Sequence, residues 1–334
     1  MNLGKLGQAL TAREIFDLIQ DDLLRVEQRL SVESIASVDT VTAITQYLQS
    51  SGGKRLRPSL LLLAAKLTGE TVTETAVQLG AVVELVHAAT LVHDDVIDVA
   101  ETRRGRPSTN VKWGNHVCVL AGDWIYMQAF QIALRERSFQ ILDLLISLTQ
   151  MMVEGELLQL ERIGQIEISE ADCMELVDRK TACLFSVCAR LGAISMQADM
   201  IVQEKLGEYA WNLGMAFQLV DDVLDFTARE KTLGKPVGGD LREGKVTLPL
   251  VYALECATAP ERSQVETILR QRNYDTVPFE RIREMVRKYR AIERVKDRAQ
   301  AFTDRARQII SEFPESPYQR ALLAITELVT ERDH

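Results

Sequence analysis

The stretch Glu84–Asp98, ELVHAATLVHDDVID, decides the fold of this chain. Its first residues are mostly apolar, which is typical of a helix buried on nearly all sides. Three carboxylates follow at Asp94, Asp95 and Asp98, in the order D-D-x-x-D. Residues three and four apart lie on one face of a helix. The pattern therefore predicts clustered carboxylates at the end of a buried helix.

The segment 218–225, QLVDDVLD, repeats this arrangement at Asp221, Asp222 and Asp225, again after apolar residues. Carboxylates held close together on buried helices repel one another and lose solvation unless they are protonated or bind cations. Magnesium prefers oxygen ligands and commonly shares phosphate oxygens with the protein. One such cluster would as readily be a solvated helix face. Two copies on apolar helices favour a magnesium–phosphate site.

The rest of the chain has few residues that interrupt helices. Its 334 residues include 18 glycines and 8 prolines, with no proline between Pro107 and Pro236. Helical spacing and start signals predict helices that open at the capping box 11–14 and cover 60–67, 75–99, 114–161, 170–198 and 203–228. We therefore expect an all-α bundle of ten or more helices, formed by residues 1–334 as a single domain.

Charge and cysteine content exclude several classes of protein. The net charge is −9 and no run of basic residues occurs, so we expect no nucleic-acid partner. Five cysteines without a C-x-x-C pair indicate neither a disulfide framework nor a zinc site, and fit a reducing cytoplasm. No signal peptide or bilayer-spanning stretch of about 18 uncharged residues is evident. We expect a soluble, cytoplasmic protein that an apolar substrate could bring to a membrane surface.

Basic residues lie beside the chain breaks and the acidic clusters, where they could bind phosphate. The stretch GGKRLRP, 52–58, carries Lys54 and Arg57 at a helix start, where backbone N–H groups also favour anions. The other residues singled out for this reason are Arg103, Arg104, Lys180, Thr181, Lys235 and Lys245. Lys235 belongs to a Gly-rich loop, 233–240, that we expect to close over a ligand.

The ordered set of motifs resembles the trans-isoprenyl (polyprenyl) diphosphate synthases. The motifs are G-G-K-R-x-R-P at 52–58, D-D-x-x-D at 94–98 followed by R-R-G at 103–105, G-D at 122–123, G-E-x-x-Q at 155–159, K-T at 180–181, F-Q-x-x-D-D-x-x-D at 217–225 and G-K-P-x-G-x-D at 234–240. The resemblance implies the isoprenoid synthase fold with a central cavity, a homodimer, and Mg²⁺-dependent condensation of isopentenyl diphosphate with an allylic diphosphate.

The resemblance also implies a role for each matching residue. The magnesium ligands would be Asp94, Asp95, Asp98, Asp221, Asp222 and Asp225, which with Lys180 form the catalytic set. The allylic diphosphate would be held by Arg103, Lys180, Thr181, Gln218, Lys235 and Lys245. Isopentenyl diphosphate would be held by Lys54, Arg57, His87 and Arg104.

Small residues before Asp94 favour a long product. Each helical turn is about 5.4 Å, on the order of one isoprene unit, so a bulky aromatic one turn before Asp94 would stop the growing chain. Ala89 and Thr90 stand there instead, and Val86 follows further back. Met127 and Phe130 could face them from another helix. We expect about eight or more isoprene units, as in a quinone side chain, with a shorter geranylgeranyl or farnesyl product as the alternative.

Three other classes of protein fit parts of the pattern. A di-iron bundle needs two E-x-x-H motifs, and this chain has one at 84–87 and another only at its last residues, 331–334. A non-catalytic subunit of a heteromeric synthase would be expected to lose an acidic motif, and both are intact. A terpene cyclase shares the acidic motifs but needs no isopentenyl site at Lys54, Arg57 and His87.

Overall fold

The first structural feature of the chain is the capping box that the sequence predicts. In the computed structural model, which describes residues 10–50, 52–53, 55–69, 71–227 and 237–330, the Thr11 backbone N–H donates to the Glu14 carboxylate. The Glu14 N–H donates in return to the Thr11 hydroxyl oxygen. This exchange satisfies backbone donors at the start of α1, which covers Ala12–Asp17.

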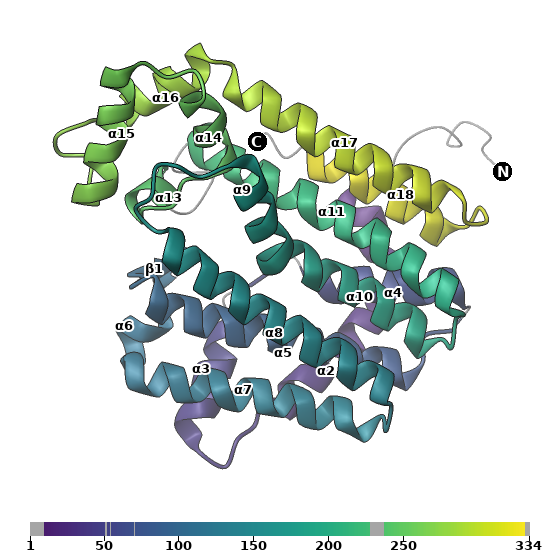
Figure 1. Ribbon diagram of the computed structural model, residues 1–334. Helices are drawn as coiled ribbons and strands as arrows, with labels where there is room; N and C mark the ends of the chain where they lie inside the picture. The colour runs from purple at the N-terminus through teal and green to yellow at the C-terminus, as the bar shows by residue number, and fades with distance from the viewer. Residues whose placement is uncertain (1–9, 51, 54, 70, 228–236, 331–334) are drawn as a thin grey trace.

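The described residues form more than ten helices and one short hairpin, so the prediction of an all-α bundle is confirmed (Figure 1). The other helices are α2 (Gln20–Glu33), α3 (Asp39–Ser50), α4 (Leu56–Thr68), α5 (Glu74–Ile97), α6 (Thr109–Trp113), α7 (Asn115–Arg135), α8 (Phe139–Arg162), α9 (Glu170–Val177), the π-helix η2 (Asp178–Ala182), α10 (Cys183–Ser195), α11 (Met200–Thr227), α13 (Gly239–Arg242), α14 (Leu248–Leu254), α15 (Ala259–Gln271), α16 (Phe279–Lys288), α17 (Ala291–Ser311) and α18 (Pro317–Thr330). The hairpin pairs β1 (Thr102–Arg103) with β2 (Arg106–Pro107).

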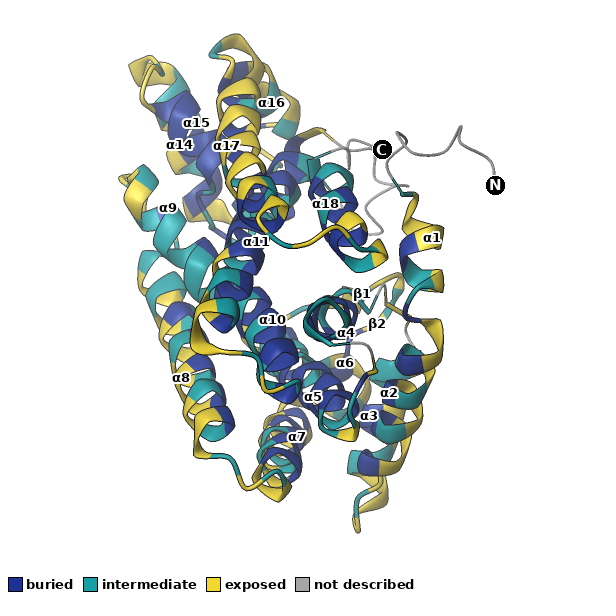
Figure 2. Cartoon of the chain, turned by 90° about the vertical axis from the view of Figure 1, so that its right-hand side faces the viewer, coloured by how far each residue is buried: buried dark blue, intermediate teal, exposed yellow. Residues whose placement is uncertain are grey.

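Helices α5 and α11 carry the two acidic clusters, η2 carries the K-T motif and leads directly into α10, and these elements form the middle of the bundle. Helix α5 packs against α7, α4, α2 and α10, while α11 packs against α10 and α17. Buried residues concentrate on α5, α10 and α11, whereas the outer helices show exposed faces (Figure 2). The core therefore fixes the positions of all three motif-bearing helices.

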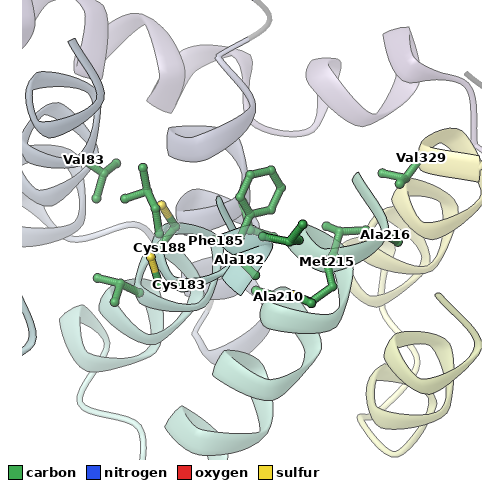
Figure 3. Close-up of a cluster of buried hydrophobic side chains, with 14 of the residues drawn as sticks. Val83, Ala182, Cys183, Phe185, Cys188, Ala210, Met215, Ala216 and Val329 are labelled. Carbon is green, nitrogen blue, oxygen red and sulfur yellow. The ribbon is translucent and has the colours of Figure 1, made fainter. Parts of the chain in front are cut away.

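Close packing joins these helices around the K-T motif. Buried side chains run from Val83 on α5 through Phe185 on α10 to Met215 on α11 (Figure 3). Gly214 of α11 faces η2 so closely that an added Cβ would lie 2.7 Å from the Ala182 Cα. A larger residue at 214 would push α11 away from η2, because such interiors have no room to spare.

The structure divides two segments that the sequence predicts as continuous helices. The 114–161 segment is broken at Arg137, whose φ is 52°, and Ser138 then caps the start of α8. The 170–198 segment contains η2 between α9 and α10. Neither interruption carries a Gly or Pro, so the breaker count alone did not predict it.

Helices α5 and α7 are long and apolar enough to cross a membrane by length and composition alone. Most of α5 is buried in the bundle, as expected of a core helix. Helix α7 is less buried and exposes Leu120, Met127 and Leu134.

Candidate active site

A cavity of about 630 Å³ lies where both acidic clusters and most of the predicted basic residues meet. Its walls come from α5, α8, α9, η2, α10, α11 and the segments around 100–104 and 240–247. The charged or polar residues that line it include Arg57, His87, Asp94, Asp98, Arg103, Arg104, Lys180, Thr181, Gln218, Asp221, Asp222, Asp240 and Lys245. Lys54 and Lys235 lie outside the described residues.

Within each acidic cluster the three carboxylates have different surroundings. Asp95 is fully buried and accepts hydrogen bonds from Arg103 Nε at 2.6 Å and from the Thr109 N–H and hydroxyl at 3.0 and 2.9 Å. Asp225 is buried beneath the next segment and accepts from the Gly239 N–H at 3.2 Å. Neither of the two lines the cavity, so the structure directs both toward protein donors.

The carboxylates that face the cavity are held in conditions that disfavour their charge. Burial raises the pKa of Asp94 to about 6, and Glu156 and Asp98 add to the shift against the opposing effect of Lys180. Burial, then Asp240, raises the pKa of Asp222 well above its usual range, although Gln218 donates to its Oδ1 at 2.9 Å. A bound divalent cation would relieve both carboxylates.

The donor set suits magnesium shared with a phosphate better than a closed protein cage. Among the residues that the structure describes, no group of three or more His, Cys, Asp and Glu is arranged to hold a metal ion by itself. Carboxylates from α5 and α11 nevertheless line one cavity, at Asp94, Asp98, Asp221 and Asp222. Because Mg²⁺ keeps several waters and uses one or two carboxylates plus phosphate oxygens, these residues fit it.

Three basic residues, Arg57, His87 and Arg104, also line the cavity. Arg57 is partly buried, its buried Nε has no hydrogen-bond partner, and burial lowers the pKa of the guanidinium, with Arg104 contributing to the fall. Burial also lowers the pKa of His87 well below its usual range, followed by the effects of Arg57 and Arg104. Basic residues gathered on one part of a cavity favour an anionic ligand, and the unpartnered Arg57 Nε has a donor for it.

The K-T motif is connected by hydrogen bonds to both flanking helices. Lys180 Nζ lies 2.5 Å from Glu156 Oε2 and donates to Gln159 Oε1 at 3.0 Å, both on α8. The Thr181 hydroxyl donates to Gln218 Oε1 at 2.8 Å. Gln218 in turn donates to Asp222, so a hydrogen-bonded chain runs from η2 to the second acidic cluster.

A second cavity, of about 350 Å³, opens from the first between α5, α7 and α8, and we call it the apolar slot. Both cavities share Thr90, Asp94, Met152 and Lys180. The other residues that line the slot are His93, Val96, Ile97, Val119, Asp123, Tyr126, Val153, Glu156, Leu157 and Leu160.

The predicted chain-length residues lie differently with respect to the slot. Thr90 lines it, but Ala89 and Val86 are fully buried in helix packing and line neither cavity. Met127 is largely exposed. Sequence reasoning missed Tyr126, which follows the G-D motif by one helical turn and faces the slot. The chain-length roles of Ala89, Thr90 and Val86 stay predictions.

The di-iron interpretation finds no support in the geometry. Glu84 forms an ion pair with Arg55 at 3.1 Å, and the second E-x-x-H segment, 331–334, lies outside the described residues. The glutamate of the E-x-x-H sequence on α5 is therefore paired with Arg55.

Comparison with known proteins places the chain in a family. A family model for polyprenyl synthetases matches residues 38–286. The octaprenyl diphosphate synthase of Haemophilus influenzae is 34% identical over 99% of this chain and 100% of that protein. The geranylgeranyl diphosphate synthase of Saccharolobus solfataricus is also 34% identical, over 88% of this chain and 90% of that protein.

A solved structure gives the same answer. The polyprenyl synthase from Caulobacter crescentus, complexed with calcium and isoprenyl diphosphate, superposes with a TM-score of 0.92 at 33% identity, over 98% of this chain and 99% of that one. The fold is thus that of the isoprenoid synthases. The chain belongs to the polyprenyl synthetase family and is a prenyltransferase.

Proposed function

We propose that this enzyme is a Mg²⁺-dependent trans-polyprenyl diphosphate synthase that condenses isopentenyl diphosphate with an allylic diphosphate to make a long-chain product. One observation carries the proposal. A cavity lined by acidic residues from two helices and by basic residues from other segments adjoins an apolar slot, and the two share Thr90, Asp94 and Lys180. Charged head groups and a hydrocarbon chain would occupy these adjoining spaces.

The acidic side of the cavity would hold the allylic diphosphate. Asp94 and Asp98 from α5 and Asp221 and Asp222 from α11 would bind Mg²⁺ together with the diphosphate oxygens. Mg²⁺, when bound, stabilises the negative charge of the leaving diphosphate. Asp95 and Asp225 would act through the segments they anchor: Asp95 orients Arg103, and Asp225 holds the start of α13.

Lys180 and Lys245 would orient the diphosphate against the slot. As the allylic C1–O bond breaks, its electron pair leaves with the diphosphate, and the two ammonium groups stabilise the developing charge. Thr181, fixed by Gln218, would hold the same group. Met152, which is buried between the two cavities, would shield the carbocation from water.

The cationic side would bind isopentenyl diphosphate. Arg57, His87 and Arg104 line this wall, and Arg57 Nε has a donor to spare. Bound here, the isopentenyl double bond attacks allylic C1. The proton lost from the new intermediate goes to the departing diphosphate, so no further protein base is needed.

We also propose that the enzyme is a homodimer with α7 and α8 at the interface. Leu120, Met127 and Leu134 on α7 and Phe139, Ile146, Val153, Leu157 and Leu160 on α8 are exposed apolar residues. An exposed apolar surface of this extent marks an interaction site. Three of these residues, Val153, Leu157 and Leu160, also line the apolar slot, so a second copy would complete its outer wall.

A product of about eight or more isoprene units would extend through the slot and along the exposed residues of α8. Thr90 is small at the junction of the two cavities, and the slot continues to the exposed α8 residues rather than ending within the chain. The test is to incubate the enzyme with Mg²⁺, farnesyl diphosphate and labelled isopentenyl diphosphate and to determine the product length.

A further inference from the structure

The G-E-x-x-Q motif of α8 has no role in the proposal so far, yet it forms the contact between α8 and η2. Gly155 lies so close to η2 that an added Cβ would be 2.7 Å from Arg179 Cβ and 3.4 Å from Lys180 Cγ. The missing side chain therefore lets α8 approach the lysine directly. A π-helix turn such as η2 is itself frequent at functional sites.

The other two residues of the motif contact the lysine ammonium group itself. Glu156 Oε2 lies 2.5 Å from Lys180 Nζ, and Gln159 Oε1 accepts a hydrogen bond from Nζ at 3.0 Å. Glu156 is mostly buried and lines the apolar slot, while Gln159 lines the larger cavity. The ammonium group is thus held at the junction of the two cavities.

A lysine at this position needs such support. Its flexible four-carbon side chain loses rotamer entropy when it is held in one conformation. The ammonium donates to the Glu156 carboxylate and to the Gln159 amide oxygen, one turn further along α8, and these two contacts fix both the direction and the reach of the side chain. Two donor positions of the ammonium are then used, which leaves a third for a ligand.

We propose that Glu156 and Gln159 are positioning residues that orient the Lys180 ammonium toward the diphosphate of the allylic substrate. This inference rests on the proposed role of Lys180 at that diphosphate. Neither α8 residue touches the substrate in this scheme. Their effect on the binding of the allylic diphosphate passes through Lys180, so it should vanish when Lys180 is absent.

A double-mutant cycle tests this coupling. We expect Glu156→Gln to raise the KM for the allylic diphosphate at least about fivefold, the size of a lost charge-assisted contact, and to leave the KM for isopentenyl diphosphate within about twofold. In the Lys180→Ala background, the same substitution should change neither KM by more than about twofold.

The chain offers a matched control on the same two elements. Glu154 of α8 forms an ion pair with Arg179 of η2 at 2.8 Å, but on the exposed side and lining neither cavity. Glu154→Gln removes an equivalent charge, and we expect it to leave both KM values unchanged.

Equal effects of Glu156→Gln in the two backgrounds, or an equal rise of both KM values, would overturn the proposal. If Glu156→Gln lowers the melting temperature by more than Glu154→Gln does, Gln159→Leu replaces it in the same cycle under the same criteria. Unmutated enzyme that fails to use the two diphosphates would instead contradict the proposed function, so the two failures are distinguishable.

Discussion

The Lys245 ammonium lies 3.0 Å from Asp98 Oδ1 and joins two segments that are 147 residues apart in the chain. Glu243 also contacts Lys245, at 2.7 Å. Burial opposes the charge on Lys245, but Glu243 and Asp98 outweigh it and raise the pKa of the ammonium group. In the substrate-free enzyme, a protein cation therefore occupies one carboxylate of the first acidic cluster.

Removing this cation should free Asp98 for magnesium. We expect Lys245→Gln to tighten Mg²⁺ binding to the substrate-free enzyme by about threefold to tenfold, because an ammonium no longer competes for the carboxylate. The same variant should raise the KM for the allylic diphosphate. Calorimetric titration with Mg²⁺ measures the first effect, and weaker Mg²⁺ binding by the variant would contradict it.

The pKa of Asp94 makes metal-free stability depend on pH. Because burial raises it from 3.8 to about 6, the folded state prefers the protonated carboxyl. That preference contributes stability below about pH 4 and is lost as the pH rises through about 6. In the presence of a chelator, we expect Asp94→Asn to be more stable than the unmutated enzyme by about 1–2 kcal/mol at pH 8, with a smaller difference at pH 4.

Denaturant unfolding at the two pH values measures this difference. Saturating Mg²⁺ with an unreactive diphosphate should remove the advantage of the variant, because the unmutated carboxylate then has its partner. The prediction would be contradicted if the gain in stability from Asp94→Asn were smaller at pH 8 than at pH 4.

The sequence predicts the features of the fold and site that depend on neighbouring residues better than those that depend on contacts between distant segments. Helical spacing predicted α5 and α11, and motif order predicted the cavity that contains Asp94 and Asp221. The break at Arg137 carries no Gly or Pro, and its local signal is the Ser138 cap at the start of α8.

The different surroundings of the three carboxylates within each acidic cluster could not be predicted from the sequence either. Helical spacing places Asp95 beside Asp94 and Asp98 but says nothing about Thr109, which approaches it from α6. Only the tertiary fold shows that this carboxylate is already occupied by protein donors. The contacts of Lys180 with Glu156 and Gln159 likewise join helices whose approach the sequence leaves undetermined.

Arg57 should contribute to the binding of isopentenyl diphosphate without stabilising the substrate-free fold. We expect Arg57→Met to raise the KM for isopentenyl diphosphate at least about tenfold, because charge-assisted contacts to the diphosphate are lost. The melting temperature of the substrate-free variant should stay the same or rise, since burial already disfavours this charge. Kinetics at saturating allylic diphosphate and a thermal melt check both effects. An unchanged KM together with a lower melting temperature would indicate a purely structural residue.

The proposed dimer predicts different effects of two similar substitutions. Leu120 on α7 is 69% exposed and Ile201 on α11 is 67% exposed, so neither substitution should disturb the monomer core. We expect Leu120→Glu to dissociate the dimer, because a charge would be buried without a partner at the interface, and Ile201→Glu to leave it intact. Sedimentation velocity distinguishes these results, and dissociation by both variants or by neither would contradict the proposed interface.

Thr90 should limit product length more directly than Ala89. Because Thr90 lies at the junction of the two cavities, Thr90→Phe should close the slot and shorten the product while the first condensation continues. The sequence also predicts shortening by Ala89→Phe. Ala89 is fully buried in helix packing, so we expect a large ring there to cost about 1–3 kcal/mol of stability as well. If Thr90→Phe made products of unchanged length, the slot would have no part in chain elongation.

The central claim is that the apolar slot accepts a long hydrocarbon chain grown at the adjoining diphosphate site. The most direct measurement is the length of the product made from farnesyl diphosphate, labelled isopentenyl diphosphate and Mg²⁺. We predict a main product of about 40 carbons or more, that is, about eight or more isoprene units. A main product of about 15 or 20 carbons would contradict the claim, because a slot that continues past Thr90 gives no reason for the chain to stop there.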